Sequence, residues 1–197
     1  MGNCCCCGGT EVMGSRIEKL LPEIAWVTDE ALRGQVVATY EDALKTGGWE
    51  PEDMETIPFT LLIPDCPASY LVHTRGVTRM AKVIYEEFNS LYKENGGFQL
   101  DHDLLIAGAL LHDVGKLVEY EKKDGKVVKS KMGKDLRHPF SGTGLAMRNG
   151  VPSRVCHCIA VHAHEGDDGY RCPEAVVINK CDFVNFETIK SFLGLLK

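Results

Sequence analysis

The sequence lacks a long hydrophobic run, a surplus of positive charge and a secretory signal peptide. No stretch approaches the roughly 18 consecutive apolar residues of a membrane span, so no stable insertion into a bilayer is expected. The chain has 22 Lys and Arg against 28 Asp and Glu, a formal net charge of −6. Proteins that bind nucleic-acid polymers neutralise phosphates with basic residues, so such a partner is not expected either. With 197 residues and 44% hydrophobic content, the chain is long enough for one domain with its own core.

The nine cysteines do not form the pattern of a disulfide-stabilised protein. Four are consecutive, Cys4 to Cys7, and the total is odd. Without a signal peptide, reduced thiols and a cytoplasmic location are expected. The start of the chain has two other interpretations, a lipid anchor on Gly2 and a thiolate metal site, but Cys6 occupies the Ser or Thr position of the myristoylation pattern. We therefore predict a disordered, functionally neutral tail over residues 1–14.

The N-terminal region, residues 15–67, is expected to pack on a larger domain formed by residues 68–197. Apolar residues recur at helical spacing over residues 16–24 and 29–45, and Thr28 is a plausible N-cap for the second helix. Residues 51–67 hold four of the eight prolines. This stretch is predicted to be a connector that crosses the surface of the domain.

The remaining sequence predicts an all-α fold with one small β-hairpin. Helices are expected over residues 68–94, 104–111, 138–149, 152–162 and 173–196. Polar and apolar residues alternate over residues 119–130 around Asp124-Gly125, which predicts a hairpin with a tight turn. Residues 104–111 are almost entirely apolar, so this helix should be buried and should carry the next two residues into the core.

Those two residues, His112 and Asp113, are unusual at the end of an apolar helix, because burying unpaired polar groups costs several kcal/mol. An isolated His-Asp pair could equally be a hydrogen-bonded core pair or a cap. Imidazole and carboxylate groups also occur on, or at the end of, four other predicted helices: His73, His138, His162 and Asp182. Together these six residues form a ligand set suited to Fe, Mn or Zn.

The segment Leu111-His112-Asp113-Val114-Gly115-Lys116 resembles the signature of the HD phosphohydrolase superfamily. The resemblance extends over residues 68–185 and implies an HD-domain helical bundle. It implies that His73, His112, Asp113 and Asp182 form the family's one-metal set. His138 and His162 match the two additional histidines of the subset that binds a second metal.

This resemblance implies two divalent cations, with Fe or Mn favoured and Zn, Mg, Ni and Co as alternatives. Asp113 would bridge them, and a hydroxide shared between them would be the nucleophile. Three basic residues near the ligands are candidates for phosphate contacts, although solvated or salt-bridged surface roles are alternatives: Lys116, Arg75 and Arg137. His164 competes with His162 for the ligand position and is otherwise a substrate-contact candidate, whereas His102 is expected to be exposed and His157 to be structural.

The predicted function is hydrolysis of a small, nucleotide-like phosphate monoester or diester, with Asp113 and Lys116 in the catalytic roles. The order and spacing of the ligands are similar to those of symmetrical diadenosine tetraphosphate hydrolases. HD-GYP phosphodiesterases share other segments, but the paired histidines of that group are separated here by Ala163. Two other classes remain open: a di-iron oxygenase that cleaves a C–P or C–C bond, and a non-catalytic HD sensor or binding module. The sequence fixes no oligomeric state.

Overall fold

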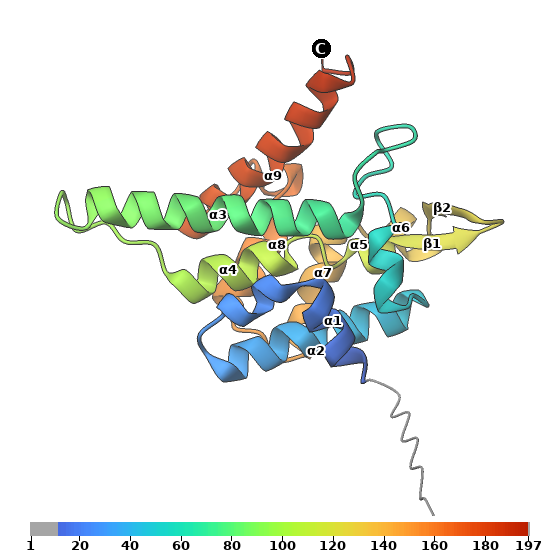
Figure 1. Ribbon diagram of the computed structural model, residues 1–197, viewed down its shortest axis with the longest axis horizontal. Helices are drawn as coiled ribbons and strands as arrows, with labels where there is room; N and C mark the ends of the chain where they lie inside the picture. The colour runs from blue at the N-terminus through green and yellow to red at the C-terminus, as the bar shows by residue number, and fades with distance from the viewer. Residues whose placement is uncertain (1–11, 197) are drawn as a thin grey trace, which may run out of the picture.

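The computed structural model describes residues 12–196, and Figure 1 shows a bundle of helices with one hairpin at its edge. The chain begins with α1 (Met13–Leu20), which starts inside the range predicted as a tail. Residues 1–11, with the Gly2 and Cys4 to Cys7 alternatives, lie outside the described part. The helix expected over 16–24 is wrong in its second half, where η1 (Pro22–Trp26) is a 3₁₀ turn. The cause is Pro22, which disfavours helical backbone at the preceding Leu21 (φ −118°, ψ 67°).

Helix α2 (Glu30–Gly47) is capped by Asp29, whose side chain accepts from the Leu32 amide at 2.9 Å. The predicted cap, Thr28, is therefore wrong by one residue. Thr28 instead donates its amide and its hydroxyl to the Asp103 carboxylate at 2.9 and 2.7 Å. These bonds join the start of α2 to the start of the helix His102–Leu111, α4.

The connector is more buried than its proline content predicts. It contains η2 (Pro51–Glu55) and an isolated bridge between Pro58 and Ser69. Ile57, Phe59 and Ile63 are each 2% exposed or less. The prediction of a surface connector is therefore only partly right, because this segment also closes one side of the core.

Helices α3 (Tyr70–Tyr92) and α4 (His102–Leu111) form the centre of the bundle. Every residue of α4 from Leu104 to Leu111 is buried, as its apolar sequence predicts, and α4 packs against α3, α8 and α9. The apolar residues of α3 are only partly buried, because Val72, Val83 and Leu91 are exposed. Within residues 12–196, no helix combines the length and apolarity needed to cross a bilayer.

A short helix, α5 (Lys116–Glu119), leads into the hairpin of β1 (Tyr120–Lys123) and β2 (Lys126–Lys129). The strands are antiparallel, with Tyr120 opposite Lys129. Both turn residues have positive φ, 50° at Asp124 and 74° at Gly125, as an Asp-Gly hairpin turn requires. The predicted hairpin is confirmed, whereas α5 and α6 (Lys131–Asp135) were not predicted.

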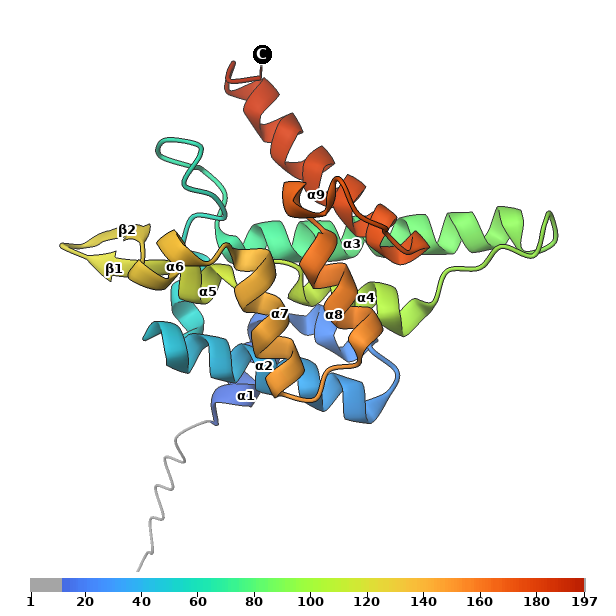
Figure 2. The ribbon, with the colours of Figure 1, turned by 180° about the vertical axis from the view of Figure 1, so that it is seen from behind.

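The last third of the described chain supplies α7 (His138–Arg148), α8 (Ser153–Val161), η3 (His164–Gly166) and α9 (Pro173–Phe192). Figure 2 shows α7 and α8 side by side, with the C-terminal end of α9 rising away from the other helices. The all-α class with one hairpin is confirmed. Because α3, α4, α7, α8 and α9 surround one core, residues distant in sequence can meet at its centre.

Candidate metal centre

The six predicted ligands lie together in two groups of three. His73, His112 and Asp182 form one group, and Asp113, His138 and His162 form the other; within each group the ligand atoms lie within 4.8 Å of one another. Each of α3, α7 and α9 carries one of these residues. His112 and His162 occupy the C-caps of α4 and α8. The helical bundle therefore positions all six side chains from five helices and the turn after α4.

Asp113 stands between the two groups, and its two oxygens face different histidines. Its Oδ2 lies 3.2 Å from His73 Nε2 and 3.4 Å from His112 Nε2. Its Oδ1 lies 3.3 Å from His138 Nε2 and 3.5 Å from His162 Nε2. Each oxygen of Asp113 therefore faces its own pair of imidazole nitrogens.

Backbone carbonyls fix the orientation of His112 and His162. The Nδ1 of His112 donates to the Ala109 carbonyl at 2.7 Å, and that of His162 donates to the Ile159 carbonyl at 2.8 Å. A carbonyl oxygen only accepts, so the proton of each neutral ring sits on Nδ1. The lone pair of each Nε2 is then directed at Asp113 and is available to a cation.

Side chains orient the other two imidazoles. His73 Nδ1 lies 2.9 Å from Asn185 Oδ1, and His138 Nδ1 donates to Glu119 Oε2 at 2.7 Å. Glu119 is 2% exposed and also accepts from the backbone amide of His138 at 2.8 Å. A carboxylate that holds the outer nitrogen of a histidine is a recurring support for metal ligands. Sequence patterns gave no sign of this role for Asn185 or Glu119.

One polar atom in the cluster supports a fit to metal. Asp113 Oδ1 is buried and has no hydrogen-bond donor. The two nitrogens nearest to it, on His138 and His162, present lone pairs when the rings are neutral. A buried carboxylate oxygen that faces lone pairs is costly unless a cation lies between them. The donor set of imidazole and carboxylate therefore fits a divalent cation at this point.

The charges around the cluster differ between its two sides. Burial opposes protonation of His73, but its hydrogen bonds to Asp113 and Asp182 outweigh burial and raise its pKa to about 9. On His138 burial prevails and lowers the pKa to about 4, despite the hydrogen bond to Glu119. A cation that binds the first group would therefore replace a proton on His73.

Lys116, predicted to contact phosphate, is buried and holds Asp113. Its Nζ lies 2.6 Å from Asp113 Oδ2 and 2.7 Å from the carbonyl oxygen of Phe59. Burial lowers the pKa of this amine, but the nearby Asp113 charge outweighs that effect and raises it above its usual value. Lys116 therefore remains charged and compensates part of the negative charge of the cluster.

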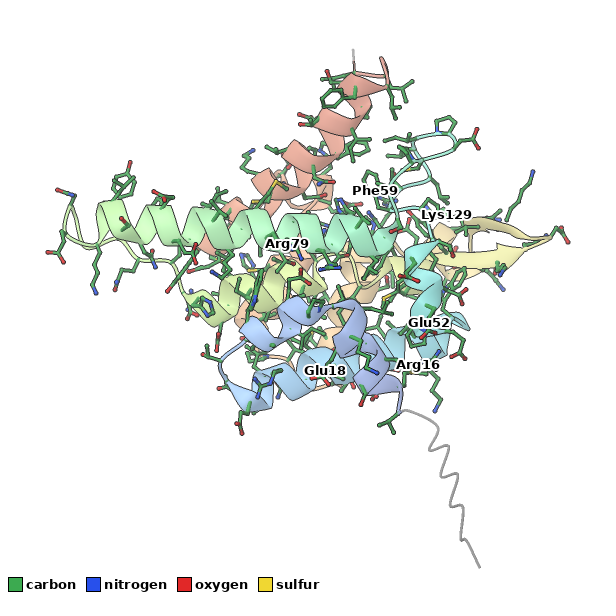
Figure 3. All side chains as sticks on the ribbon, viewed as in Figure 1. Arg16, Glu18, Glu52, Phe59, Arg79 and Lys129 are labelled. Atoms are coloured by element: carbon green, nitrogen blue, oxygen red, sulfur yellow. The ribbon has the colours of Figure 1, made fainter. Side chains whose placement is uncertain are left out.

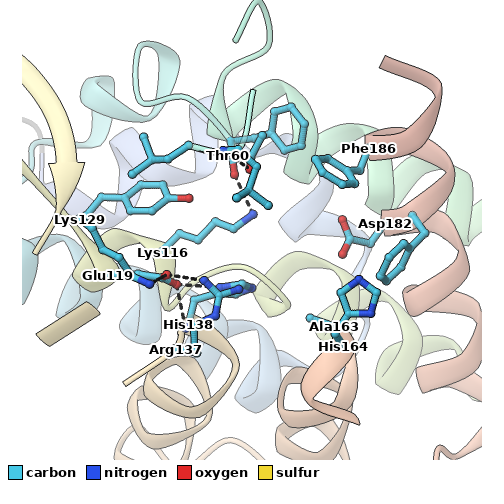
Figure 4. A pocket seen from close by; sticks show the side chains of 15 residues that line it. Thr60, Lys116, Glu119, Lys129, Arg137, His138, Ala163, His164, Asp182 and Phe186 are labelled. Atoms are coloured by element: carbon cyan, nitrogen blue, oxygen red, sulfur yellow. Dashed lines mark hydrogen bonds and ion pairs between the residues drawn. The ribbon is translucent and has the colours of Figure 1, made fainter. Parts of the chain in front are cut away.

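A cleft of about 200 Å³ lies directly beside the cluster, and Figure 4 shows its lining. His138 and Asp182, one from each group, are part of its wall. Figure 3 labels two further lining residues, Phe59 from the connector and Lys129 from the hairpin. This volume is smaller than the roughly 300 to 1,000 Å³ of pockets for drug-sized ligands, so the cleft suits a small molecule.

The cleft has a basic side and an aromatic side. Lys116, Lys129 and Arg137 lie in Figure 4 on the side of the hairpin, and α9 contributes Phe183 and Phe186 to the other. Arg137 is shared between two acids, Glu119 at 2.7 Å and Glu165 at 2.9 Å. Neither Lys129 nor the two phenylalanines were predicted.

Of the predicted substrate contacts, Lys116, Arg137 and His164 line the cleft, and Arg75 does not. Arg75 Nε donates to the two carboxylate oxygens of Glu23, on η1, at 3.0 and 3.1 Å. Its guanidinium therefore joins α3 to the N-terminal region. The structure gives no support for a phosphate contact there.

The remaining histidines lie outside both groups. The side chain of His164 is 78% exposed and hydrogen-bonds Asp167 at 2.9 Å, whereas that of His162 is fully buried. His157 accepts from the Cys172 amide at 3.2 Å, a structural contact. His102, predicted to be exposed, is 27% exposed in its side chain and pairs with Asp103.

Comparison with known proteins gives one curated relative and one family. The Dihydroneopterin 2′,3′-cyclic phosphate phosphodiesterase of Methanocaldococcus jannaschii is 25% identical over 179 residues, which cover 84% of this chain and 67% of the relative. No solved structure matches the chain. The profile of the HD domain matches residues 70–184, more than half of the chain and the region that holds all six clustered residues. The chain therefore belongs to the HD domain family.

Proposed function

We propose that this chain is a metal-dependent phosphohydrolase that cleaves a small phosphate ester, with two divalent cations sharing Asp113. The observation that carries the proposal is that the two oxygens of Asp113 face different ligands. One oxygen faces His73 and His112, and the other faces His138 and His162. A single-metal site would not need an imidazole pair on each oxygen.

The two groups would each hold one cation, His73, His112 and Asp182 on one side and His138 and His162 on the other. Fe and Mn suit this mixture of imidazole and carboxylate, and Zn, Mg, Ni and Co are the alternatives. When bound, two such cations supply positive charge to phosphoryl oxygens and lower the pKa of water in the site toward neutrality.

The protein's own residues hold this centre rigid and shape the substrate side. Lys116 fixes the rotation of the Asp113 carboxylate because its ammonium group donates both to Oδ2 and to the Phe59 carbonyl of the connector. Glu119 fixes His138 through both its ring and its backbone amide. The orientation of these two ligands is thus set before substrate arrives, which is how a site avoids reorganisation during reaction.

The cleft is suited to an ester that is anionic at one end and apolar at the other. Lys129 and Arg137 would attract the phosphate, and the rings of Phe183 and Phe186 would contact an apolar or aromatic group. The relative's name describes a phosphodiesterase that acts on a cyclic phosphate. That name supports phosphodiester hydrolysis over the oxygenase and binding-module alternatives.

The test begins with anaerobic purification and measurement of metal content per chain. The protein is then assayed with Mn²⁺ or Fe²⁺ against a 2′,3′-cyclic nucleotide, an aryl phosphodiester, an aryl phosphomonoester and a phosphonate, with dioxygen uptake recorded. We expect phosphate-ester hydrolysis that Asp113→Asn abolishes and that the control His102→Ala retains. Dioxygen-dependent loss of the phosphonate, or no turnover of any ester by a protein carrying two metals, would overturn the proposal.

A further inference from the structure

Two buried thiols lie side by side one helical turn from the cluster. Cys158 is on α8 and Cys172 is the N-cap residue of α9, and their Sγ atoms are 3.9 Å apart. Cys158 is 0% and Cys172 5% exposed. The mechanism proposed above uses neither thiol. A disulfide bond has a sulfur–sulfur distance of about 2.05 Å, so the two sulfurs would have to approach each other by about 1.9 Å to form one.

The chemistry of the two thiols is complementary. The contact with the Cys158 sulfur lowers the pKa of Cys172 to about 7, despite partial burial. The same contact, together with burial, raises the pKa of Cys158 above its usual value. Cys172 also accepts from the Ala175 amide at the start of α9, so it is the more acidic of the two thiols, and Cys158 lies in the position of a resolving partner.

The position of Cys158 connects this pair to the ligands. Cys158 precedes His162 by four residues on α8, and Gly108 precedes His112 by four residues on α4. A Cβ placed on Gly108 would lie 3.0 Å from Cys158 Cβ, so the two helices touch at this point. A shift of Cys158 toward Cys172 would therefore disturb the packing directly beneath two ligands.

We propose that Cys158 and Cys172 form a reversible disulfide site, oxidised by small peroxides, and that closing it weakens cation binding by His162. The Cys172 thiolate attacks one oxygen of hydrogen peroxide, the O–O bond breaks, and the departing hydroxide takes up a proton to become water. The sulfur of Cys158 then attacks the resulting sulfenic acid, its S–O bond breaks, and the hydroxide leaves with the Cys158 proton as a second water. Two thiols lose two electrons, and peroxide is reduced to two waters.

Closing the disulfide should weaken cation binding because metal sites tolerate only small displacements of their ligands. Ligand positions at metal sites are defined to about 0.2 Å, far less than the sulfur movement that closure needs. His162 is held from both sides, by the Ile159 carbonyl at its Nδ1 and by Asn179 at its own carbonyl at 2.7 Å. A displacement of α8 therefore reaches its ring. This consequence rests on the proposed function, whereas the disulfide itself does not.

The test treats the reduced, chelator-washed full chain with hydrogen peroxide, blocks remaining thiols, and maps the product by mass spectrometry. We expect a cross-link between the peptides of Cys158 and Cys172, a loss of the mass of two hydrogen atoms, and reversal by dithiothreitol. Cys158→Ser and Cys172→Ser should each abolish it. Cys156→Ser, a buried thiol on the same helix that bonds the Val151 carbonyl at 3.4 Å, should not.

Manganese titration of the reduced and oxidised forms provides the second readout. We expect oxidation to weaken one of two binding events on the order of tenfold, and the loss to be absent in Cys172→Ser after the same treatment. Sulfinic acid on Cys172 without a cross-link would overturn the disulfide. A cross-link that leaves both binding events unchanged would overturn the coupling. Reduced protein that binds no second cation would instead refute the two-metal proposal and leave the disulfide standing.

Discussion

Replacing Glu119 by Gln tests whether the cluster depends on the residues that orient its ligands. Glu119 is buried and accepts from His138 Nδ1 at 2.7 Å and from its amide at 2.8 Å, and it pairs with Arg137 and Lys129 at 2.7 and 3.3 Å. Gln has the same shape but no charge. It can still accept one bond from the imidazole, so the ring stays in place while its outer nitrogen loses a charged partner.

The expected loss is in cation affinity at one group only. Removing an outer partner of a ligating histidine typically weakens metal binding about 10- to 100-fold, equivalent to about 1.4 to 2.7 kcal/mol. The loss should fall on the group that contains His138 and His162, because Glu119 touches neither His73 nor Asp182. Isothermal titration with Mn²⁺, in which the proposed two-cation site should give two binding events, measures this loss. Thermal unfolding in chelator reports the stability of the fold.

The matched control is Glu165→Gln. Glu165 pairs with the same Arg137, at 2.9 Å, but makes no hydrogen bond to His138. Its replacement removes the other, more exposed charge pair of Arg137, which is worth only about 0 to 1 kcal/mol. If both variants weaken cation binding equally, or if Glu119→Gln weakens both binding events alike, then the ring is not positioned through its outer nitrogen and the reasoning fails.

Three further predictions address the cluster and the fold. His138→Ala should remove one of the two proposed cations per chain and most hydrolysis while the fold remains. His164→Ala, which alters a cleft histidine outside both groups, should keep both cations. Metal content per chain and circular dichroism measure these outcomes. Lys116→Met should lower the free energy of unfolding in chelator by about 3 kcal/mol or more, because the buried Asp113 charge loses its partner. With Mn²⁺ present the loss should be clearly smaller. An equal loss in both conditions would mean that only packing was lost. Asp103→Asn should cost about 1 to 2 kcal/mol at neutral pH, because the groups at the start of α2 outweigh burial and lower the pKa of Asp103 to about 2. Since the folded-state pKa lies below the ordinary value of 3.8, this difference from the wild type should be constant above about pH 4 and disappear as the pH falls through about 2, as measured by denaturant unfolding in chelator.

Part of the cluster could be predicted from a local signal, because His112 and Asp113 follow an almost entirely apolar helix. The other four members, His73, His138, His162 and Asp182, lie on or at the ends of other predicted helices, and the resemblance to the HD superfamily selected them. The residues that orient them carry no such signal. Glu119 and Asn185 are ordinary helical residues, and only the packing of α5 on α7 and of α3 on α9 brings them to the outer nitrogens.

The different positions of Arg75 and Arg137 show why closeness in sequence is a poor guide to a site. Arg75 follows His73 by two residues within α3, and two residues correspond to about 200° around a helix, so the two side chains point to opposite sides. Arg137 precedes His138 at the N-cap of α7, where the backbone is extended (φ −66°, ψ 152°). The direction of its side chain is therefore not set by the 100° per residue of a helix, and the side chain reaches the cleft.

The connector shows that residues outside the matched HD region help to build the site. Phe59 lies before residue 70, yet its ring stacks on His73 at 4.4 Å between centroids, with 18° between the ring planes. Its carbonyl oxygen accepts from the Lys116 ammonium group, which also donates to Asp113. Phe59 therefore contacts the predicted ligand His73 and the lysine that holds Asp113 in place. Its ring also meets Phe186 edge-on at 6.1 Å, on the aromatic side of the cleft. The connector, which lies outside the matched HD region, and α9 thus form part of the cleft wall beside the six clustered residues.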